Sequence, residues 1–531
     1  MQIPFDRADD LRIGMDVGGT NTDAVVLDTS NEIICSTKVA TTRDVTTGIS
    51  QALETVLTAL GPRRRFVSKL MLGTTHATNA VTERHGLNKV GVIRLGRKAA
   101  SAVPPLSSWP RDLQEAAVGG HIQLEGGSLI DGHPFEPLNK YRLKEFLKSM
   151  AGQIDAVAIT GLFSPMFPDQ ELEVAEIVRA ELGHLMPVSL SHEVGNLSLL
   201  ERENATVLNA ALHETAAGIT GALAAAIARH GLDATAYLAQ NDGTLMSADF
   251  AARFPILTVG SGPSNSIRGA ALLSGTTNAI VADVGGTTTD FGVLVDGFAR
   301  ESVAGSVIGG VQTNFPMPDV IALAMGGGSV LTGGTVGPRS VGYRIREESL
   351  CFGGATATLS DAAIACGRWE VDPALPPNKW RTGNVNDVDF AAALSIFDDA
   401  VAESVASLSA GKEQPLIVVG GGAALIADRI SGKYDTIRPE NSGVANAVGA
   451  AIALASGQYE TIAPTSRRRD ALEEAQEKAT VRAIDAGADP DSVQIVQVIE
   501  VPLAYASEPS TRIRVKAAGA LKTGTLLYAA S

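Results

Sequence analysis

The sequence has 531 residues, with 43 Lys and Arg against 58 Asp and Glu, which gives a formal net charge of −15. That balance argues against a protein that binds nucleic acid. A hydrophobic fraction of 45% with 19% charged residues excludes disordered and collagen-like chains, and the length predicts two or more domains.

The cysteines and the N-terminus point to one compartment. The three cysteines include no CxxC pair and fit neither a disulfide framework nor a thiolate zinc site, so a cytoplasmic location is expected. Acidic residues stand where a signal peptide would be apolar, and the most apolar helical stretch, 205–228, is interrupted by His213 and Glu214. We therefore expect no export and no membrane span.

The first part of the chain mixes strand and helix patterns, which indicates an α/β domain. Expected strands cover 11–17, 24–27, 32–39, 69–73, 90–94, 156–162 and 188–191, and expected helices cover 46–60, 140–150 and 171–182. The stretch 101–137 is rich in Gly, Pro and His with little periodicity, so it is interpreted as an inserted element.

A long helix over 201–228 is predicted to bridge two halves, and a second α/β unit follows. Its expected elements are strands at 279–284 and 416–419, helices at 361–366, 388–408 and 446–455, and a glycine-dense region at 325–354. A charged helix from 465 and strands at 493–501 and 511–517 predict a C-terminal helix with a small sheet. The predicted domains are 1–200, 201–464 and 465–531.

One segment occurs twice. Asp16–Asp23 (DVGGTNTD) and Asp283–Asp290 (DVGGTTTD) agree at seven of eight positions, differing only at Asn21 and Thr288. Each follows an apolar strand and precedes another, so an internal duplication of one hairpin unit is the natural inference.

Small residues in these turns let backbone amides converge on a phosphate, and a Thr hydroxyl adds a donor. The carboxylates of Asp16 and Asp283 cannot approach phosphate unless Mg²⁺ intervenes, so the pattern predicts a metal held by these two residues. The glycines after the strand at 416–419 leave room for an adenine ring. The predicted phosphate- and nucleotide-binding residues are Gly18, Gly19, Thr20, Thr22, Gly285, Gly286, Thr287, Thr288, Gly420, Gly421 and Gly422.

The arrangement resembles the actin, Hsp70 and sugar-kinase superfamily, and within it the hydantoinase/oxoprolinase A family. The motifs that carry the resemblance are the two DVGGT segments, Gly73–Ala80 (GTTHATNA), Leu190–Val194 with the helix after Glu201, Arg253–Pro255, Ser261–Pro263, Gly326–Ser329 and Asn446–Ala451. Segments 337–346 and 350–354 depart from the pattern of family members that hydrolyse cyclic amides. We therefore expect the substrate-binding part of the site to differ from theirs. The resemblance implies two ribonuclease-H-like domains around a nucleotide cleft, with ATP as cofactor.

The implied reaction is ATP-dependent opening of a cyclic amide, a lactam or hydantoin-like compound, after phosphoryl transfer to its carbonyl oxygen. Asp16 and Asp283 would hold the hydrated metal. Asp23 and Asp290 either orient the Thr loops, or Asp290 positions a water. His76 is the favoured substrate-side residue, against the alternative of an incidental imidazole in a helix N-cap.

Other interpretations stay open. A metal site at His121 and His133 is conceivable, although solvated loop histidines fit as well. The protein could instead be a kinase of a small metabolite from the same superfamily, or an ATP-switched accessory subunit. A second subunit or a homo-oligomer is a further expectation from the family.

Overall fold

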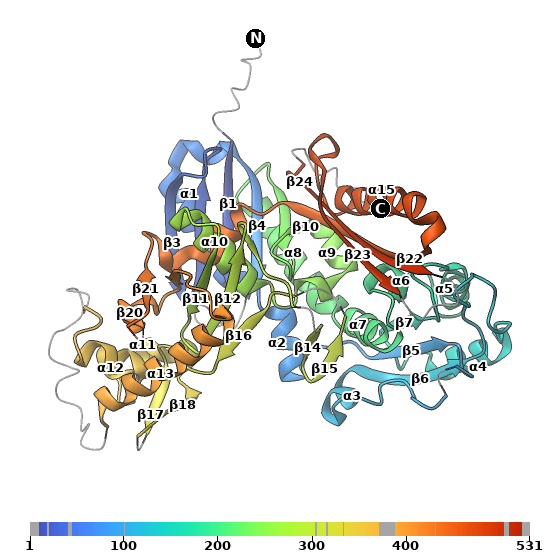
Figure 1. Ribbon diagram of the computed structural model, residues 1–531, viewed down its shortest axis with the longest axis horizontal. Helices are drawn as coiled ribbons and strands as arrows, with labels where there is room; N and C mark the ends of the chain where they lie inside the picture. Colours follow the sequence, from blue (N-terminus) through green and yellow to red (C-terminus); the bar gives the residue numbers. More distant parts are fainter. Residues whose placement is uncertain are drawn as a thin grey trace, which may run out of the picture.

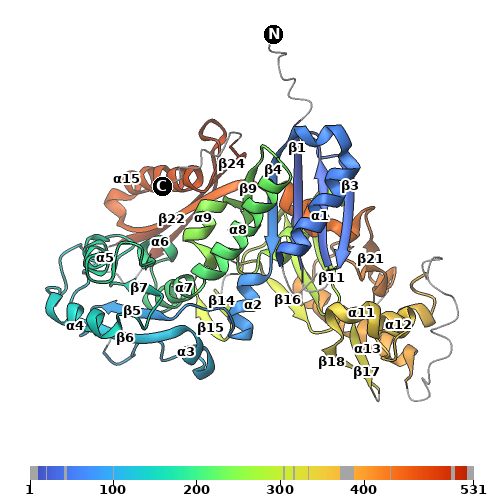
Figure 2. The same ribbon diagram turned by 180° about the vertical axis from the view of Figure 1, so that it is seen from behind.

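The computed structural model describes residues 10–18, 21–40, 45–99, 101–302, 305–314, 317–332, 334–370, 388–430, 432–503 and 509–522. These residues form an α/β protein in which helices cover large β-sheets (Figure 1). The reverse view shows α1 and α8 lying in front of the N-terminal strands (Figure 2). The predicted α/β fold class is therefore confirmed.

The first sheet has nine strands in the order β23-β24-β22-β10-β9-β4-β1-β2-β3. Their bounds are β1 Leu11–Val17, β2 Asn21–Leu27, β3 Ile33–Ala40, β4 Val67–Thr74, β9 Thr235–Ala239, β10 Leu245–Ser247, β22 Ala455–Pro464, β23 Gln494–Leu503 and β24 Ser510–Gly519. Apolar residues of α1 (Val45–Leu60) and α8 (His213–Arg229) bury one face of its N-terminal part. Helix α15 (Arg468–Asp485) packs its alanines on β22 and β24.

The C-terminal strands differ in one respect from the expectation. Both expected strands form, but β23 and β24 extend the first sheet through β22 instead of making a small sheet of their own. The reason is that β22 pairs in parallel with β10, which carries the sheet onward. The division of the chain into three domains stays a prediction.

The second sheet repeats the plan of the first. It contains β11 Ala279–Val284, β12 Thr289–Val295, β13 Phe298–Ala299, β16 Val320–Leu323, β19 Leu416–Val419, β20 Arg429–Ile430 and β21 Tyr434–Ile437. Strand β1 pairs antiparallel with β2 and parallel with β4, and β11 pairs antiparallel with β12 and parallel with β19. Helices α12 (Leu359–Ala365) and α13 (Phe390–Ser409) cover one face of this second sheet.

Two crossing helices join the halves. Helix α10 (Ser261–Ser274; Figure 1) packs on the second sheet, and α14 (Ala445–Ala451) packs on β1 and β2. A Cβ added at Gly269 would overlap the carbonyl oxygen of Ala445, and one at Gly449 would overlap that of Asn265. Only glycine permits this backbone approach, so the two sheets are held on one tightly packed helix pair.

A third, parallel sheet has the order β6-β5-β7-β8, with bounds Val118–Leu124, Val90–Leu95, Ala156–Thr160 and Val188–Leu190. Helices α4 (Lys140–Met150) and α5 (Asp169–Leu182) pack on it. The stretch 101–137, interpreted from the sequence as an inserted element, supplies α3 (Arg111–Ala117) and the edge strand β6.

The predicted long helix over 201–228 is wrong, because the structure has α7 (Leu199–Ala211) and α8 with a bend of 51° between them. Asn88 explains the break. Its backbone N–H donates to the carbonyl oxygen of Ala211 at 2.8 Å, and its side-chain oxygen accepts from the N–H of Glu214 at 3.0 Å. These bonds take the places of intrahelical ones and start a new helix.

The helix expected at 446–455 also ends earlier, at Ala451, because Ala455 already begins β22. The remaining elements are α2 His76–Glu83, α6 Ser191–Val194, α9 Ala248–Arg253, α11 Ile345–Glu348, β14 Ser306–Ile308, β15 Val311–Thr313, β17 Ser329–Thr332 and β18 Thr335–Ser340. Within the described chain, no helix by itself has the length and apolar composition of a membrane span, and α7 and α8 reach it only as a bent pair.

Candidate functional site

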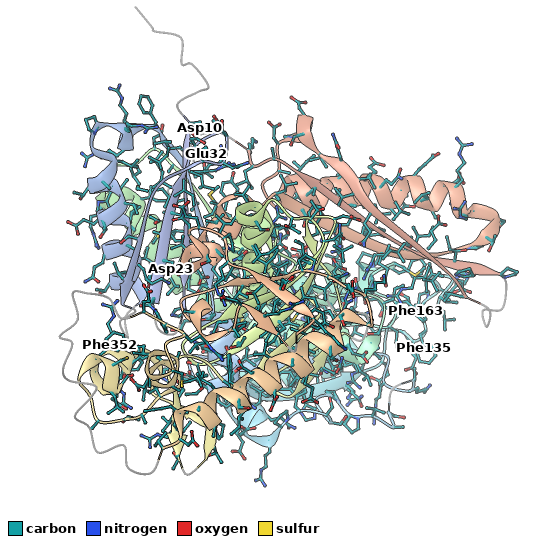
Figure 3. All side chains as sticks on the ribbon, turned by 60° about the vertical axis from the view of Figure 1, so that its left-hand side comes forward. Asp10, Asp23, Glu32, Phe135, Phe163 and Phe352 are labelled. Carbon is teal, nitrogen blue, oxygen red and sulfur yellow. The ribbon has the colours of Figure 1, made fainter. Side chains whose placement is uncertain are left out.

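The duplicated hairpins each place two aspartates side by side. Asp16 lies directly opposite Asp23 in the β1–β2 pairing, and Asp283 lies opposite Asp290 in the β11–β12 pairing. Because strand side chains alternate between faces, each opposed pair shares one face of its sheet. Figure 3 labels Asp23 toward the lower end of the N-terminal strands, whereas Asp10 and Glu32 lie at the upper end.

The aspartates of the two halves lie within electrostatic reach of one another. Burial, followed by the charges of Asp23 and Asp283, raises the pKa of Asp16 to about 8. Burial and the charge of Asp283 raise the pKa of Asp290 to about 7, and burial also raises the pKa values of Asp23 and Asp283. We call Asp16, Asp23, Asp283 and Asp290 the carboxylate cluster. It is a concentration of buried acid that favours a bound cation.

Lys38 is the cation that faces this cluster. It lies on β3 opposite Asp23, and its Nζ is 2.7 Å from that carboxylate. Its charge also lowers the pKa values of Asp16 and Asp283, although burial outweighs it there. A Cβ on Gly421 would be 4.0 Å from the Lys38 Nζ, so this lysine spans the space between the halves.

Asp16 and Asp283 have different partners. The Asp283 carboxylate accepts hydrogen bonds from the Ser266 hydroxyl and, at 3.2 Å, from the Asn446 amide. The Asp16 Oδ1 is buried without a hydrogen-bond partner, and so are both side-chain polar atoms of Asn265. A Cβ on Gly73 would lie 2.8 Å from Asp16 Oδ1 and 2.7 Å from Asn265 Nδ2, so these unsatisfied groups flank the same glycine. Buried unpaired polar atoms of this kind need a ligand or water.

One hydrogen bond recurs at the described ends of the two hairpin turns. The N–H of Gly18 donates to the carbonyl of Asn21 at 3.1 Å, and the N–H of Gly285 donates to that of Thr288 at 2.9 Å. In the second turn, the carbonyls of Gly285 and Gly286 accept from the amides of residues 327 and 328. In a trans peptide the N–H points opposite to the C=O. The N–H groups of residues 286 and 287 therefore point away from residues 327 and 328, as a phosphate-binding turn requires.

The Gly420–Gly422 turn packs against the second hairpin. The N–H of Gly422 donates to the carbonyl of Val284 at 2.8 Å. Gly420 has φ +90°, and a Cβ there would overlap the carboxylate of Asp283. The turn after β19 therefore needs glycine to approach Asp283.

His76 begins α2 just after β4, whose last residues pair with Asp16 and Val17. Its Nδ1 lies 2.8 Å from the hydroxyl of Thr74, which fixes the ring, and burial lowers its pKa. The Gly73–Ala80 motif also contacts the start of α10, because the Thr78 hydroxyl accepts from the N–H of Gly260 at 3.1 Å. His76 is thus held beside the first hairpin with a neutral ring.

Other predicted residues are placed differently. Thr22 lies on the opposite face from Asp23, where its hydroxyl would be 3.0 Å from a Cβ on Gly48 of α1. Thr287 is exposed at the turn. Gly19 and Thr20 lie outside the described residues.

Sequence reasoning missed Lys38, Asn265 and Ser266. Counting the β2–β3 register would have placed Lys38 opposite Asp23. The run of buried serine and asparagine on α10 was a signal as well, because polar residues on the buried face of a helix usually have partners.

The predicted metal would have few protein ligands. Among the described residues there is no group of three or more His, Cys, Asp or Glu side chains arranged to hold a metal ion. Mg²⁺ is commonly held by one or two carboxylates with phosphate and water oxygens, and the unpaired Asp16 Oδ1 beside the Asp283 charge fits that donor set. His121 and His133 are exposed.

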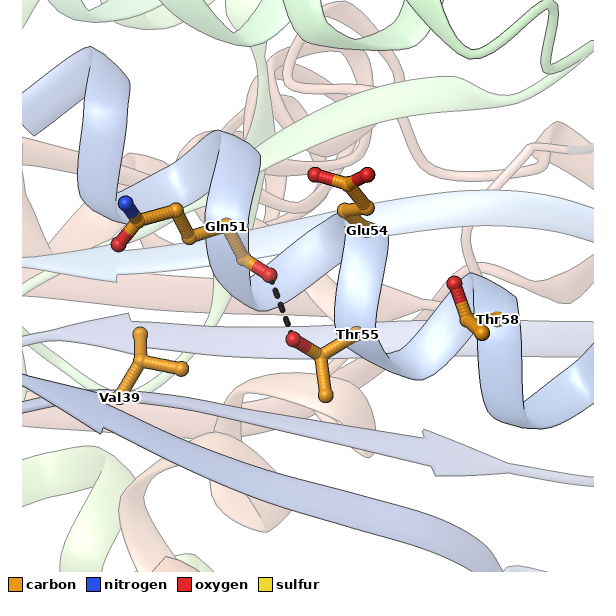
Figure 4. A pocket seen from close by; sticks show the side chains of 5 residues that line it. All are labelled: Val39, Gln51, Glu54, Thr55 and Thr58. Atoms are coloured by element: carbon orange, nitrogen blue, oxygen red, sulfur yellow. Dashed lines mark hydrogen bonds between the residues drawn. The ribbon is translucent and has the colours of Figure 1, made fainter.

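A separate pocket of about 480 Å³ lies between α1 and β3 (Figure 4). It is lined by Val39, Gln51, Glu54, Thr55 and Thr58, and the Thr55 hydroxyl donates to the carbonyl of Gln51. The lining contains no cation and no residue of the carboxylate cluster. It is therefore not the predicted phosphate site.

Two family models match the chain. A model of the hydantoinase/oxoprolinase N-terminal region matches residues 12–182, and a hydantoinase/oxoprolinase model matches residues 202–387. The chain belongs to the hydantoinase/oxoprolinase family. The resemblance predicted from the sequence motifs is thereby confirmed.

Two relatives within the hydantoinase/oxoprolinase family are named as enzyme subunits. The chain is 28% identical to the caprolactamase subunit alpha of Pseudomonas jessenii, over 67% of this chain and 54% of that protein. It is also 28% identical to the acetophenone carboxylase gamma subunit of Aromatoleum aromaticum, over 67% of this chain and 53% of that protein. The chain thus spans about half the length of these curated relatives.

A solved structure shows the fold. The crystal structure of the ATP-dependent caprolactamase from Pseudomonas jessenii matches with a TM-score of 0.77 at 20% identity, covering 96% of this chain and 88% of that one. The fold is of the actin-like ATPase type, as predicted.

Proposed function

We propose that this chain binds ATP between its two duplicated hairpins and transfers the γ-phosphoryl group to the carbonyl oxygen of a cyclic amide. The observation that carries the proposal is the carboxylate cluster, in which aspartates of both hairpins lie within electrostatic reach of one another and of Lys38. A buried acidic cluster beside two glycine turns suits a metal-bound triphosphate.

Most of the predicted residues have a part in this proposal. The turns at Gly18–Thr20 and Gly285–Thr288 bind the phosphates through their amides, and Gly420–Gly422 receives the adenosine. Asp16 and Asp283 hold Mg²⁺, which when bound neutralises charge on the phosphate oxygens. Lys38 adds a fixed positive charge on the same side.

The substrate side is assigned to His76. Its Nδ1 is engaged with Thr74, and the lowered pKa keeps the ring neutral, so Nε2 is available to hold the amide or a water. Asp290, with a pKa of about 7, is suited to position or deprotonate a water near neutral pH.

The proposed reaction begins with phosphoryl transfer. The amide carbonyl oxygen forms a bond to the γ-phosphorus as the bond to the ADP oxygen breaks. Water then adds to the activated carbon, and the ring C–N bond breaks as the nitrogen takes a proton, which leaves an acyl phosphate; a second water attacks the acyl carbon, and the phosphorylated oxygen leaves as phosphate. The products are ADP, phosphate and an open-chain amino acid or its carbamoyl derivative.

The names of the relatives support activation of a carbonyl oxygen in general, and they support ring opening only in part. One is named for a caprolactamase and another for a ketone carboxylase, and both names denote subunits. We therefore propose that a second subunit assists the reaction. We also propose a cytoplasmic location, which the three free cysteines support.

Isotope transfer tests the proposal directly. The chain is incubated with ATP, Mg²⁺ and lactams or hydantoins labelled with ¹⁸O at the carbonyl, and ADP and the released phosphate are analysed. We expect lactam-stimulated ADP and label in the phosphate. Unlabelled phosphate would contradict carbonyl phosphorylation, and a phosphorylated polyol in a parallel screen would favour the kinase alternative.

Ring opening by a second subunit would not hide the first step. Scrambling of ¹⁸O from the β–γ bridge of labelled ATP reports reversible phosphoryl transfer even when hydrolysis stalls. Scrambling that depends on the lactam supports the proposal, whereas slow ATP turnover that no small molecule stimulates would favour an ATP-switched accessory subunit.

A further inference from the structure

A cavity of about 800 Å³ lies between the C-terminal strands and the β12–β13 hairpin. One wall is formed by Arg512, Arg514 and Lys516, which alternate along β24 and therefore share a face of the sheet. The other wall includes Asp296 and Glu301 of the hairpin segment. None of its lining residues belongs to the carboxylate cluster, so this is a separate space.

The charges of the lining balance. Among the described residues, the lining has four basic side chains, those of 300, 512, 514 and 516, and four acidic ones, those of 242, 296, 301 and 460. A lining of this kind favours a ligand that carries both charges over one with a net charge, because each end finds an opposite charge.

Most of these cations are already well paired. The Lys516 Nζ is 2.8 Å from Asp242 and 3.2 Å from Glu301, and these acids raise its pKa against the effect of burial. Arg512 is 2.7 Å from Glu460. Both ion pairs include a carboxylate that is at most 6% exposed, so these pairs are structural.

Arg514 is the exception. Its guanidinium makes one hydrogen bond among the described residues, a long one of 3.4 Å to Glu301, although a guanidinium carries five N–H donors. It is 24% exposed, so the unused edge is accessible. A planar guanidinium with free donors binds a carboxylate through two parallel hydrogen bonds.

An acidic group without a cationic partner lies on the opposite wall. Asp296, in the turn between β12 and β13, accepts a hydrogen bond from Asn278 at 3.3 Å and has no ion pair within the described part of the chain. The extended residues from Phe298 to Glu301 separate it from the Arg514 contact by on the order of 10 Å. That spacing suits an aliphatic chain of several carbons.

Apolar side chains lie beside these charged groups. Phe298, Val496 and Val501 line the cavity and are 48%, 49% and 45% exposed. Covering them with hydrocarbon would favour binding, because it removes apolar surface from water.

We propose that this cavity binds a small aliphatic amino acid, with its carboxylate on Arg514, its ammonium group on Asp296 and its chain against Phe298 and β23. Opening a lactam releases a molecule of this class. The assignment of the ligand as a reaction product rests on the proposed function, whereas the binding site itself does not.

Calorimetry on the chain without nucleotide tests the site. The ligands are ω-amino acids of increasing chain length, each compared with the alkanoic acid and the alkylamine of equal length. We expect one chain length to bind best, and more tightly than either singly charged analogue by about tenfold, the effect of one charge-assisted hydrogen bond. Absence of saturable binding by any amino acid would overturn the proposal.

Three variants locate the binding. Arg514→Met should weaken binding about tenfold, whereas Arg469→Met, an exposed arginine on α15 with the same change of charge, should leave it unchanged. Asp296→Asn, at an exposed turn, should reduce amino acid affinity to that of the alkanoic acid and leave the alkanoic acid unaffected. Equal affinity of the Arg514 and Arg469 variants, or an unchanged preference in Asp296→Asn, would overturn the assignment.

The two proposals fail separately. Amino acid binding with unlabelled phosphate from the ¹⁸O lactam would preserve the cavity site and refute the reaction. Labelled phosphate without amino acid binding would do the reverse.

Discussion

The two hairpins agree at seven of eight positions, yet their aspartates have different surroundings. Asp283 accepts hydrogen bonds from Ser266 of α10 and Asn446 of α14, whereas Asp16 has a buried, unpartnered oxygen and a pKa of about 8. The duplicated sequence gives both hairpins the same strand pairing, whereas the hydrogen-bond partners of their aspartates come from the helices that cross between the halves. We infer that Asp16 is the carboxylate left open for a ligand.

The neighbouring strands differ in the same way. Lys38 of β3 stands opposite Asp23, but the matching position in the second half, on β16 opposite Asp290, holds Ala322. Burial and the charge of Asp283 raise the pKa of Asp290 to about 7, whereas Asp23 has a lysine 2.7 Å away. Burial raises the pKa of Asp23 as well, but Lys38 opposes that rise, and Ala322 carries no charge that could do the same for Asp290.

The largest expected effect comes from the first aspartates of the hairpins. Asp16→Asn and Asp283→Asn should each lower nucleotide turnover by at least about 100-fold, because each removes charge aimed at the metal-bound phosphates. Steady-state ADP release measures this. Retained turnover in either variant would remove that residue from the metal site.

The same two variants should differ in stability. Because the folded-state pKa of Asp16 is about 8 against an ordinary 3.8, the nucleotide-free protein should lose stability as pH rises through that window. Asp16→Asn should remove part of this slope and be more stable than the natural protein above pH 8, while Asp283→Asn, whose hydrogen-bond donors remain, should gain less. Thermal unfolding across pH decides, and an unchanged slope in Asp16→Asn would contradict the assigned pKa.

A glycine pair tests the contact that closes the second hairpin. Gly420→Ala should destabilise the protein by about 1–3 kcal/mol, because φ is +90° and the new Cβ would overlap Asp283. Gly443→Ala is the matched control, since a Cβ there meets nothing within 4 Å. Equal melting temperatures for the two variants would show that the turn after β19 does not pack on Asp283.

Substitutions at Lys38 and at its counterpart Ala322 test what this lysine contributes. Lys38→Met should weaken binding of Mg²⁺ and ATP about tenfold by removing the fixed charge, while Lys433→Met, on an exposed turn, should not. Ala322→Lys should lower the pKa of Asp290 and shift the acidic limb of the rate profile to lower pH. A profile unchanged by Ala322→Lys would mean that Asp290 does not control it.

The smallest expected effect is that of Ser266→Ala. Loss of one hydrogen bond to Asp283 should raise the pKa of that carboxyl and lower turnover by about threefold to tenfold at pH 6.5, with less effect at pH 8.5. A loss that is equal at both pH values would assign the serine to packing instead.

The sequence predicted what local patterns determine. The strands of both hairpins, their pairing and α4 follow from periodicity and turn residues, and the repeated DVGGT segments predicted the duplicated unit. The break at Leu212 was missed, because it depends on Asn88, a residue more than 120 positions away that bonds Ala211 and Glu214. Such a contact leaves no periodic signal in the helix.

The site was predicted in part for the same reason. The aspartates and glycines stand in their own repeated motif, so the sequence alone could propose them, whereas Lys38 and Ser266 reach the aspartates only through the register of β3 and the crossing of α10 with α14. The C-terminal strands had the expected alternation, but their membership of the first sheet depends on β22 pairing with β10.

We propose that both hairpins bind one and the same nucleotide. The most direct test is calorimetric titration of a non-hydrolysable ATP analogue with Mg²⁺ into the natural protein, Asp16→Asn and Asp283→Asn. The account predicts a single site whose affinity falls at least about tenfold in each variant, because each removes a charged contact. Binding as tight as that of the natural protein in either variant would contradict it.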